Sequence, residues 1–251
     1  ILSSLENVSA EPTAKKIIRN GLQFLLREKS RDWSWNYWPR STNKKIPDDM
    51  DDTYTALIAI HIHRPDLITP AVLEKIRNHL RQTKHLLSGL HNTWMTDYRK
   101  NDIWEDVDIV INSTIGFFMT RYGANISELS TAIEVILEKC DESNHISQYY
   151  LSSITAWYFL SRFLGNRLRT PSFSIQKDTA LTTALMLSTL IHLDTPKKKL
   201  KKYVLAILDA PWNAQGLYVE SIKNNIPTYA GSEALTAAFC IEALLKYMLY
   251  E

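Results

Sequence analysis

The chain has 251 residues, of which 45% are hydrophobic and 22% are charged, an ordinary composition for a folded soluble protein. The formal net charge is only +2 and both signs are interspersed, which argues against a nucleic-acid-binding surface. No Gly/Ser-rich or Pro-rich linker interrupts the sequence. We therefore predict a single domain over residues 1–251.

The sequence contains no segment typical of a membrane-spanning helix or a signal peptide. The longest apolar stretch, Leu151–Leu164, includes Arg162 and is shorter than the roughly 18 apolar residues that a spanning helix needs. The first residues, Ile1–Glu11, lack the charged-then-apolar layout of a signal peptide. Cys140 and Cys240 fall in predicted helices, as buried free thiols of a reducing compartment do. We expect a soluble, cytoplasmic protein.

Two kinds of helix are predicted along the chain. Outer helices place apolar residues every three or four positions opposite a charged face, whereas inner helices are apolar or small on nearly all sides. In chain order the predictions are Thr13–Lys29 (outer), Asp51–His61 (inner), Ala71–His85 (outer), Asp106–Arg121 (inner), Ser127–Lys139 (outer), Gln148–Phe163 (inner), Asp178–Ile191 (inner), Lys197–Leu208 (outer) and Ser232–Leu249 (inner). Leu90–Met95 and Leu217–Ser221 are the candidates for short extended pieces within loops.

The inner helices share a local sequence pattern. Asp52-Thr53-Tyr54-Thr55-Ala56-Leu57 is echoed by residues 178–185 and more loosely by residues 232–238. An acid followed by Thr and small residues suits a helix N-terminus, where free N–H groups favour a carboxylate. Repetition at intervals of tens of residues is typical of repeat architectures. The alternation therefore predicts an all-α fold, an α/α toroid with the inner-helix ends facing a central cavity.

Four carboxylates lie within five residues at the start of a predicted inner helix. Asp48, Asp49, Asp51 and Asp52 repel one another beside an apolar helix, so at least one should keep its proton at neutral pH. A retained proton near an apolar cavity is what a general acid for a weakly basic substrate requires. The alternative is that Asp48 or Asp49 caps the helix while the other acids face water or bind a cation.

Aromatic residues accompany the acidic run. The segment Trp33-Ser34-Trp35-Asn36-Tyr37-Trp38 lies just upstream, and aromatic faces stabilise cations by roughly 0.5–2 kcal/mol each. Such rings suit a reaction that passes through carbocations, although many of them are expected to be packing anchors. The aromatic candidates for substrate contact are Trp35, Tyr37, Trp38, Trp94, Tyr150 and Trp157.

These segments resemble the catalytic region of squalene–hopene cyclases and class II diterpene cyclases. Asp49-Met50-Asp51-Asp52-Thr53 is similar to their Asp-x-Asp-Asp-Thr motif, and it follows a Trp-containing segment as it does there. The stretch 106–112, which contains Asp108, and the stretch 231–236, which contains Glu233, resemble recurring segments of bacterial members of this superfamily. Asp108 and Glu233 are therefore added to the candidates for substrate contact.

The resemblance implies a terpenoid cyclase that begins its reaction by protonation. Asp51 would protonate an alkene or epoxide of an isoprenoid, and Asp49 and Asp52 would tune and orient it. No cofactor is implied, and Mg²⁺ would enter only with a diphosphate substrate. Most members build the site between two helical barrels, whereas this chain has room for one. Either the cavity lies within the single ring or a partner domain or subunit completes it.

Other members of this superfamily and other functions remain as alternatives. Asp48-Asp49-x-x-Asp52 also fits the Mg²⁺-binding motif of class I terpene synthases, but the second metal motif is broken where Met186 follows Asp178 and Thr182. The zinc ligands of protein prenyltransferases have no counterpart in the spacing of the cysteines and histidines.

A non-catalytic lipid-binding or interaction module on the same scaffold is a further alternative. The segment Lys197-Lys198-Lys199-Leu200-Lys201-Lys202 is typical of a solvated helix face. It also leaves peripheral contact with an anionic membrane open.

Overall fold

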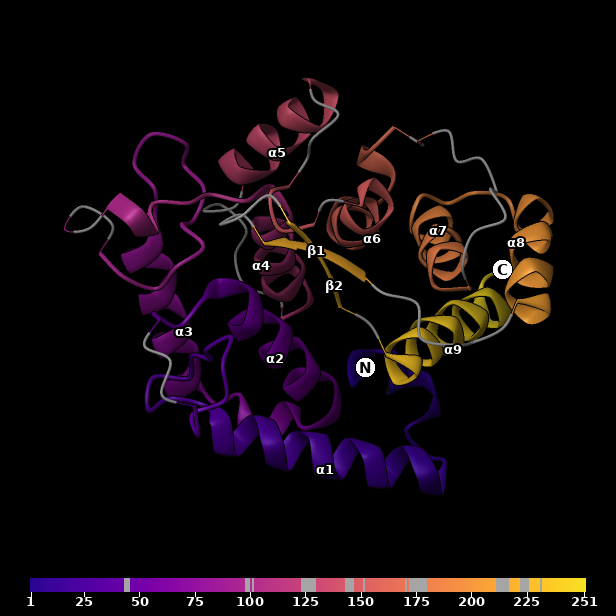
Figure 1. Ribbon diagram of the computed structural model, residues 1–251, viewed down its shortest axis with the longest axis horizontal. Coiled ribbons are helices and arrows are strands. Elements are labelled where there is room, and N and C mark those ends of the chain that lie inside the picture. The colour runs from indigo at the N-terminus through magenta and orange to yellow at the C-terminus, as the bar shows by residue number, and fades with distance from the viewer. Residues whose placement is uncertain are drawn as a thin grey trace. The chain divides into compact units, whose positions relative to one another are not determined.

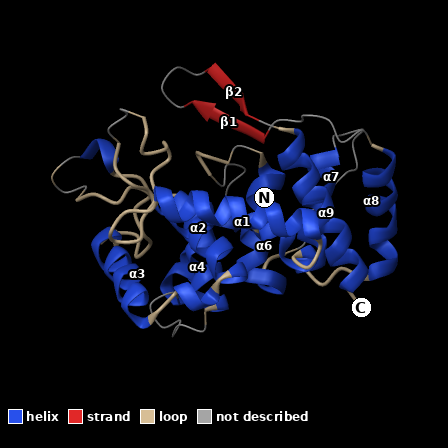
Figure 2. Cartoon of the chain, turned by 90° about the horizontal axis from the view of Figure 1, so that it is seen from below, coloured by secondary structure: helices blue, strands red, loops and turns tan. Residues whose placement is uncertain are grey.

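The computed structural model describes residues 1–42, 46–97, 100, 102–122, 130–142, 147–150, 152–169, 171, 180–210, 217–221, 226–230 and 232–251. These residues are mostly helical, as the sequence predicts (Figures 1 and 2). The α-helices are α1 Pro12–Glu28, α2 Met50–His63, α3 Pro70–Thr83, α4 Ile109–Arg121, α5 Ser130–Glu142, α6 Ser153–Leu164, α7 Ala180–His192, α8 Lys197–Asp209 and α9 Glu233–Leu249.

Shorter elements join these helices. Strands β1 (Leu217–Ser221) and β2 (Ile226–Ala230) pair antiparallel, with Leu217 opposite Ala230, so the extended segment predicted at 217–221 is confirmed. Short 3-10 helices complete the described elements at Ser3–Val8, Pro65–Leu67, Asp102–Trp104 and Gly165–Arg167. None of the helices in the described ranges is long and apolar enough to cross a membrane.

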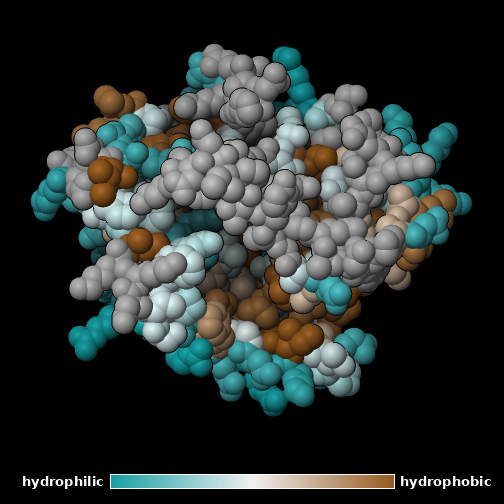
Figure 3. All heavy atoms as spheres, viewed as in Figure 1, coloured by the Kyte–Doolittle hydropathy of each residue, from teal (hydrophilic) through white to brown (hydrophobic). Residues whose placement is uncertain are grey.

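The two predicted kinds of helix differ in burial. In α1 the buried residues are Ala14, Ile18 and Leu22, on one stripe, and hydrophilic side chains line this helix at the lower edge of Figure 3. In contrast, α4 buries ten of its 13 residues, including Asn112 and Thr114. A helix buried on nearly all sides needs residues that are apolar or small all round, and this explains its sequence pattern.

Contacts between Cα atoms divide the chain into two compact units. One consists of residues 8–138 with Leu2, and it contains α1 to α4 and most of α5. Within it α2 packs against α4, and the rings of Tyr54 and Phe118 meet edge to face at 5.6 Å. This packing joins α2 and α4 in one core. We call it the N-terminal unit.

The second unit consists of residues 139–251 with Ile1 and residues 3–7, and we call it the C-terminal unit. Here α7 packs against α6, α8 and α9 around a core that includes Leu187, Leu200, Ile207 and Cys240. The contacts form these two units, and the single domain that the sequence predicts remains a prediction. Closure of the helix pairs into one toroid remains a prediction.

A buried polar network crosses the core of the C-terminal unit. Glu242 accepts hydrogen bonds from the hydroxyl of Tyr158 at 2.7 Å, from Ser4 at 2.5 Å and from the Lys246 ammonium at 2.6 Å. Burial raises the pKa of Glu242, but the cations of Lys246 and Arg162 outweigh burial and hold the pKa well below its usual range. The network therefore contains a buried, ionised carboxylate that depends on its partners.

Candidate active site

Three chain segments meet at the acidic run in the N-terminal unit. The backbone N–H of Asp49 donates to the carbonyl of Trp35 at 3.0 Å, and the N–H of Met95 donates to the carbonyl of Asp48 at 2.8 Å. The residues just before α2 therefore lie between the aromatic segment and residues 93–95, like the middle strand of a very short sheet. This arrangement brings Trp35 and Trp94 to either side of the first carboxylates.

A tight turn positions the aromatic segment. Trp33 has a φ of 63°, in the left-handed region, and Ser30 accepts its backbone N–H at 3.3 Å. The Ser34 hydroxyl donates to Oδ2 of Asp48. A hydroxyl donates only one hydrogen bond, and Ser34 donates its own to Asp48. The Ser30 hydroxyl must therefore be the donor in its 2.7 Å contact with the Ser34 hydroxyl. A chain of two serines thus fixes the Asp48 carboxylate.

Asp49 is the N-cap of α2 and is deeply buried. Its side chain is 4% exposed, and its Oδ1 accepts the backbone N–H of Asp52 at 2.8 Å. No donor among the described residues lies within hydrogen-bond distance of the other oxygen, Oδ2. A buried ionised oxygen without a donor is unfavourable, whereas a protonated one is not.

Electrostatics also favour a proton on Asp49. Burial raises the pKa of Asp49 well above the usual range, and repulsion from Asp52 and Asp51 raises it further. Burial also raises the pKa of Asp52, and interaction with the Asp49 carboxyl offsets part of that rise. The protonated carboxyl that the sequence predicts is therefore assigned to Asp49.

The aromatic residues upstream of α2 have different positions. Trp35 is buried, and its indole N–H donates to the carbonyl of Leu25 at 2.9 Å, as expected for a packing anchor. Tyr37 is 60% exposed and meets Trp38 edge to face at 4.9 Å. Trp35 thus fixes the geometry of the site, while Tyr37 faces outward.

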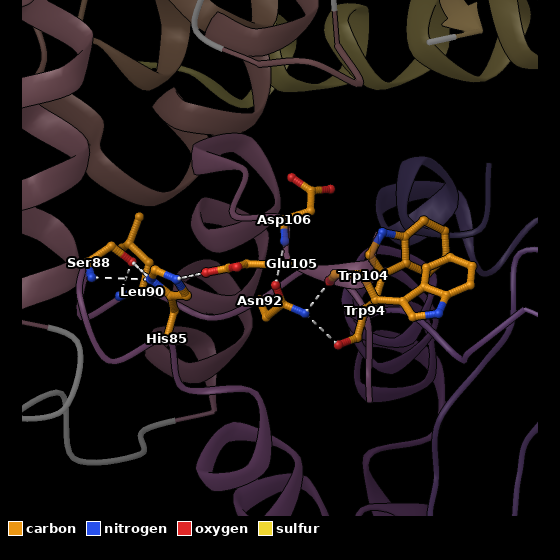
Figure 4. Close-up of polar contacts among 8 residues, drawn as sticks. All are labelled: His85, Ser88, Leu90, Asn92, Trp94, Trp104, Glu105 and Asp106. Atoms are coloured by element: carbon orange, nitrogen blue, oxygen red, sulfur yellow. Dashed lines mark hydrogen bonds and ion pairs between the residues drawn. The ribbon is translucent and has the colours of Figure 1, made fainter. Parts of the chain in front are cut away.

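A second aromatic pair, Trp94 and Trp104, lies beside Asn92 (Figure 4), and Trp94 pairs with Asp49 of the acidic run through an isolated β-bridge. The rings of Trp94 and Trp104 are 5.0 Å apart, and both residues are half-buried. The Asn92 amide joins them by donating to the carbonyl of Trp94 at 3.0 Å and to that of Trp104 at 2.8 Å. Its oxygen accepts the backbone N–H of Asp106 at 2.6 Å. One buried side chain therefore holds two segments and their tryptophans together.

A hydrogen-bond chain fixes the loop that leads into this region. His85 contacts the Ser88 hydroxyl through Nδ1 and the Glu105 carboxylate through Nε2, each at 2.9 Å (Figure 4). The backbone N–H of Ser88 also points at Nδ1, at 3.2 Å, so Nδ1 is the acceptor and Nε2 carries the proton. His85 thereby connects the loop after α3 with the residue next to Trp104.

Asp108 is the buried N-cap of α4. Its Oδ1 accepts the backbone N–H groups of Val110 and Ile111 at 2.8 and 3.2 Å. Asn112 then donates to the carbonyls of Asp108 and His91, each at 2.9 Å, and accepts the His91 backbone N–H at 2.8 Å. The stretch 106–112 therefore supports the site, and its predicted substrate contact remains a prediction.

A pocket of about 380 Å³ opens beside the acidic run within the N-terminal unit. Its lining is mainly polar and includes the carboxylate of Asp48 and the ammonium of Lys75, which lies 3.6 Å from Asp32. Burial lowers the pKa of His79, which also faces the pocket, so this imidazole is held neutral. Such a lining suits water or a polar group. The remaining lining residues are Ser34, Asn78, Gln82 and Met95.

Three predicted contact residues belong to the C-terminal unit. The rings of Tyr150 and Phe159 meet at a tilt with their centres 4.9 Å apart, and Trp157 is half-buried in α6. Glu233 is the exposed first residue of α9, whose cap is Ser232. Asp178, which the repeat pattern includes, is outside the described residues. Only the N-terminal unit therefore supplies the geometry on which the candidate site is built.

Sequence comparison does not assign a family. No protein-family model matches the chain, and no curated protein matches it. In the described part of the chain, no three or more His, Cys, Asp or Glu residues are grouped so that they could hold a metal ion. The function must be inferred from the residues and their arrangement.

Proposed function

We propose that this protein is a class II-like terpenoid cyclase that starts cyclisation by protonating an isoprenoid. The observation that carries the proposal is the buried Asp49 carboxyl, whose pKa is raised well above its usual range and whose Oδ2 has no donor among the described residues. A raised pKa keeps a proton on a carboxyl at neutral pH, and a general acid must hold such a proton before it can transfer it. A structural N-cap does not require three further carboxylates within three residues.

The acids have distinct roles in this proposal. Asp49 keeps a proton beside Asp52, and Asp51, in the same helical turn, delivers a proton to the substrate. The carboxyl O–H bond breaks as a C–H bond forms at one alkene carbon, leaving a cation on the other carbon. The next double bond then attacks that cation and closes a ring, and loss of a proton ends the reaction without net oxidation or reduction.

The surroundings of the acids fit such a reaction. Trp94 pairs with Asp49 through an isolated β-bridge and packs against Trp104, and aromatic faces stabilise cations by roughly 0.5–2 kcal/mol each. The polar pocket at Asp48 gives solvent a path toward the acids, so the spent proton can be replaced. We propose that the helix pairs form a single α/α toroid whose cavity receives the hydrocarbon chain.

The proposed substrate is a linear or partly cyclised isoprenoid, either a polyprenyl diphosphate or a squalene-like hydrocarbon. The chemistry needs no cofactor, and Mg²⁺ would serve only to bind a diphosphate that survives the reaction. A partner domain or subunit is required if one ring does not enclose the substrate.

The test is turnover by purified protein with farnesyl diphosphate, geranylgeranyl diphosphate and squalene, with and without Mg²⁺. Asp51→Asn should abolish the cyclic product, and Asp49→Asn should reduce it at least tenfold. The matched control is Asp66→Asn, an acid-to-amide change at an exposed residue that is ion-paired with Arg64. It should retain wild-type activity. Equal activity in all three variants would show that the acidic run does not catalyse the reaction.

A further inference from the structure

The outward face of α8 is rich in cations. Leu200, Tyr203 and Ile207 of this helix are buried against α7 and α9 in the C-terminal unit. Their spacing of three and four residues leaves the opposite side of the helix in solvent. Four exposed lysines occupy the first half of that side, at positions 198, 199, 201 and 202.

This charge distribution is unfavourable for the helix itself. The partial positive charge of a helix N-terminus favours acids in the first turn, yet α8 has none there and begins with three successive lysines. Lys198 also lies one turn from Lys202, where like charges repel. Within the described part of the chain, no carboxylate pairs with Lys198, Lys199 or Lys201. The lysines destabilise the isolated helix, so an anionic partner is the simplest reason for them.

Apolar side chains continue the same face. Leu205 and Leu208 are 50% and 60% exposed, one and two turns beyond Lys201. The only carboxylate of α8 is Asp209, at its last position. Figure 3 shows this edge, at the right of the view, as hydrophilic side chains interleaved with hydrophobic ones. Cations followed by leucines on one helix face match the boundary between lipid headgroups and acyl chains.

The end of α9 contributes further apolar surface beside the lysines. The Lys197 ammonium donates to the carbonyl of Tyr250 and lies 5.4 Å from the ring centre of Tyr247. The neighbouring residues Met248 and Leu249 are both exposed. Figure 1 shows α8 beside the end of α9. The contacts of Lys197 therefore bring the start of α8 and the end of α9 together in the C-terminal unit.

We propose that the outer face of α8 binds the protein to an anionic lipid bilayer. The lysines contact the headgroups, and Leu205 and Leu208 enter the boundary with the acyl chains. A nucleic acid would use the cations but would leave the leucines in water, so lipid accounts for more of the surface. This inference does not rest on the proposed cyclase activity.

The experiment is co-sedimentation of the full chain with vesicles of phosphatidylcholine, alone or with 30% phosphatidylserine. Binding should require phosphatidylserine and should fall as salt is raised. The triple variant Lys198→Gln/Lys201→Gln/Lys202→Gln should bind about 100-fold more weakly, since each lysine near such a surface contributes about a fivefold effect. Leu205→Ser/Leu208→Ser should weaken binding about tenfold while keeping its dependence on salt.

The control removes three cations from another exposed helix face, as Lys15→Gln/Lys16→Gln/Arg19→Gln on α1. It should bind like the wild type. Equal losses in both triple variants, or equal binding to the two kinds of vesicle, would overturn the proposal. The last part of the experiment measures binding of the protein to a fluorescent single-stranded oligonucleotide. If the protein binds the oligonucleotide more tightly than the vesicles, and the leucine variant binds it as well as the wild type does, the surface is a nucleic-acid-binding surface instead.

Discussion

Asp49 closes the first turn of α2 by accepting the backbone N–H of Asp52 at 2.8 Å, while burial and repulsion from the Asp52 carboxylate raise the pKa of Asp49. One residue thus serves both as a helix cap and as the holder of a proton. The cap fixes Oδ1 of Asp49, and burial of Oδ2 favours the protonated form. The stability of the helix start and the acidity of the site are therefore coupled.

This coupling predicts an unusual pH dependence of stability. Because the pKa of Asp49 is raised above the value of 3.8 expected in the unfolded chain, folding takes up a proton. The free energy of unfolding therefore falls as pH rises above about 4 and through the folded pKa. Asp49→Asn keeps the cap but cannot ionise, so this variant should be more stable than the wild type at pH 7.5.

Urea unfolding between pH 4 and pH 8 measures this difference, with Asp66→Asn as the surface control. Asp49→Ala removes the cap and should be about 1 kcal/mol less stable than Asp49→Asn at every pH. An Asn variant less stable than the wild type at pH 7.5 would mean that Asp49 is ionised in the folded protein.

Burial of His91 predicts the opposite dependence on pH, in which the free energy of unfolding rises as pH rises. Burial lowers the pKa of this imidazole to about 4, so the folded protein resists its protonation. The stability that depends on neutral His91 is complete above pH 6.5 and is lost as pH falls toward 4, by at most about 3 kcal/mol. In His91→Gln the free energy of unfolding should change less over this range. Parallel pH profiles of variant and wild type, measured by urea unfolding, would refute the assignment.

The amide of Asn112 should be essential for the start of α4. Its three hydrogen bonds satisfy the backbone of His91 and the carbonyl of Asp108 inside the protein. Asn112→Ala leaves a buried N–H and two carbonyls without this partner and should cost about 2–4 kcal/mol. Asn20→Ala, at an exposed position of α1, should change stability by less than about 0.5 kcal/mol. Similar urea midpoints for the two variants would contradict this role.

The buried network of the C-terminal unit should depend on the pairing of its charges. Lys246→Met leaves Glu242 without its ammonium and should cost about 3 kcal/mol, since Lys246 is 25% exposed and part of its charge is screened. Adding Glu242→Gln removes the unpaired charge and should restore part of the loss. Thermal unfolding of the single and double variants gives the coupling. Strictly additive losses would show that the two side chains do not interact.

The sequence predicts the helices well because helical periodicity is a local property. The range Lys197–Leu208 is observed as Lys197–Asp209, and Asp51–His61 as Met50–His63. The crowding of the carboxylates is also local, so the need for a retained proton can be derived from the sequence. The assignment of that proton to Asp49 depends on where α2 begins. Only the structure shows where the helix begins.

Other parts of the site could not be predicted. Asn92 lies in a loop and Trp104 ends a short 3-10 helix, so neither has helical periodicity, and the hydrogen bonds that join them link segments more than ten residues apart. The sequence signals an aromatic role for Trp35 but does not show that its indole N–H is used by Leu25. Packing between distant segments decides whether a ring is an anchor or a cavity wall.

The proposed protonation is tested most directly by the fate of one hydrogen. The protein would be incubated in deuterated water with the isoprenoid that it turns over, and the product analysed by mass spectrometry and NMR. We predict one deuterium at the carbon that Asp51 protonates, with any diphosphate retained. A cyclic product without deuterium, formed with release of pyrophosphate, would contradict protonation and indicate that ionisation of the diphosphate starts the reaction.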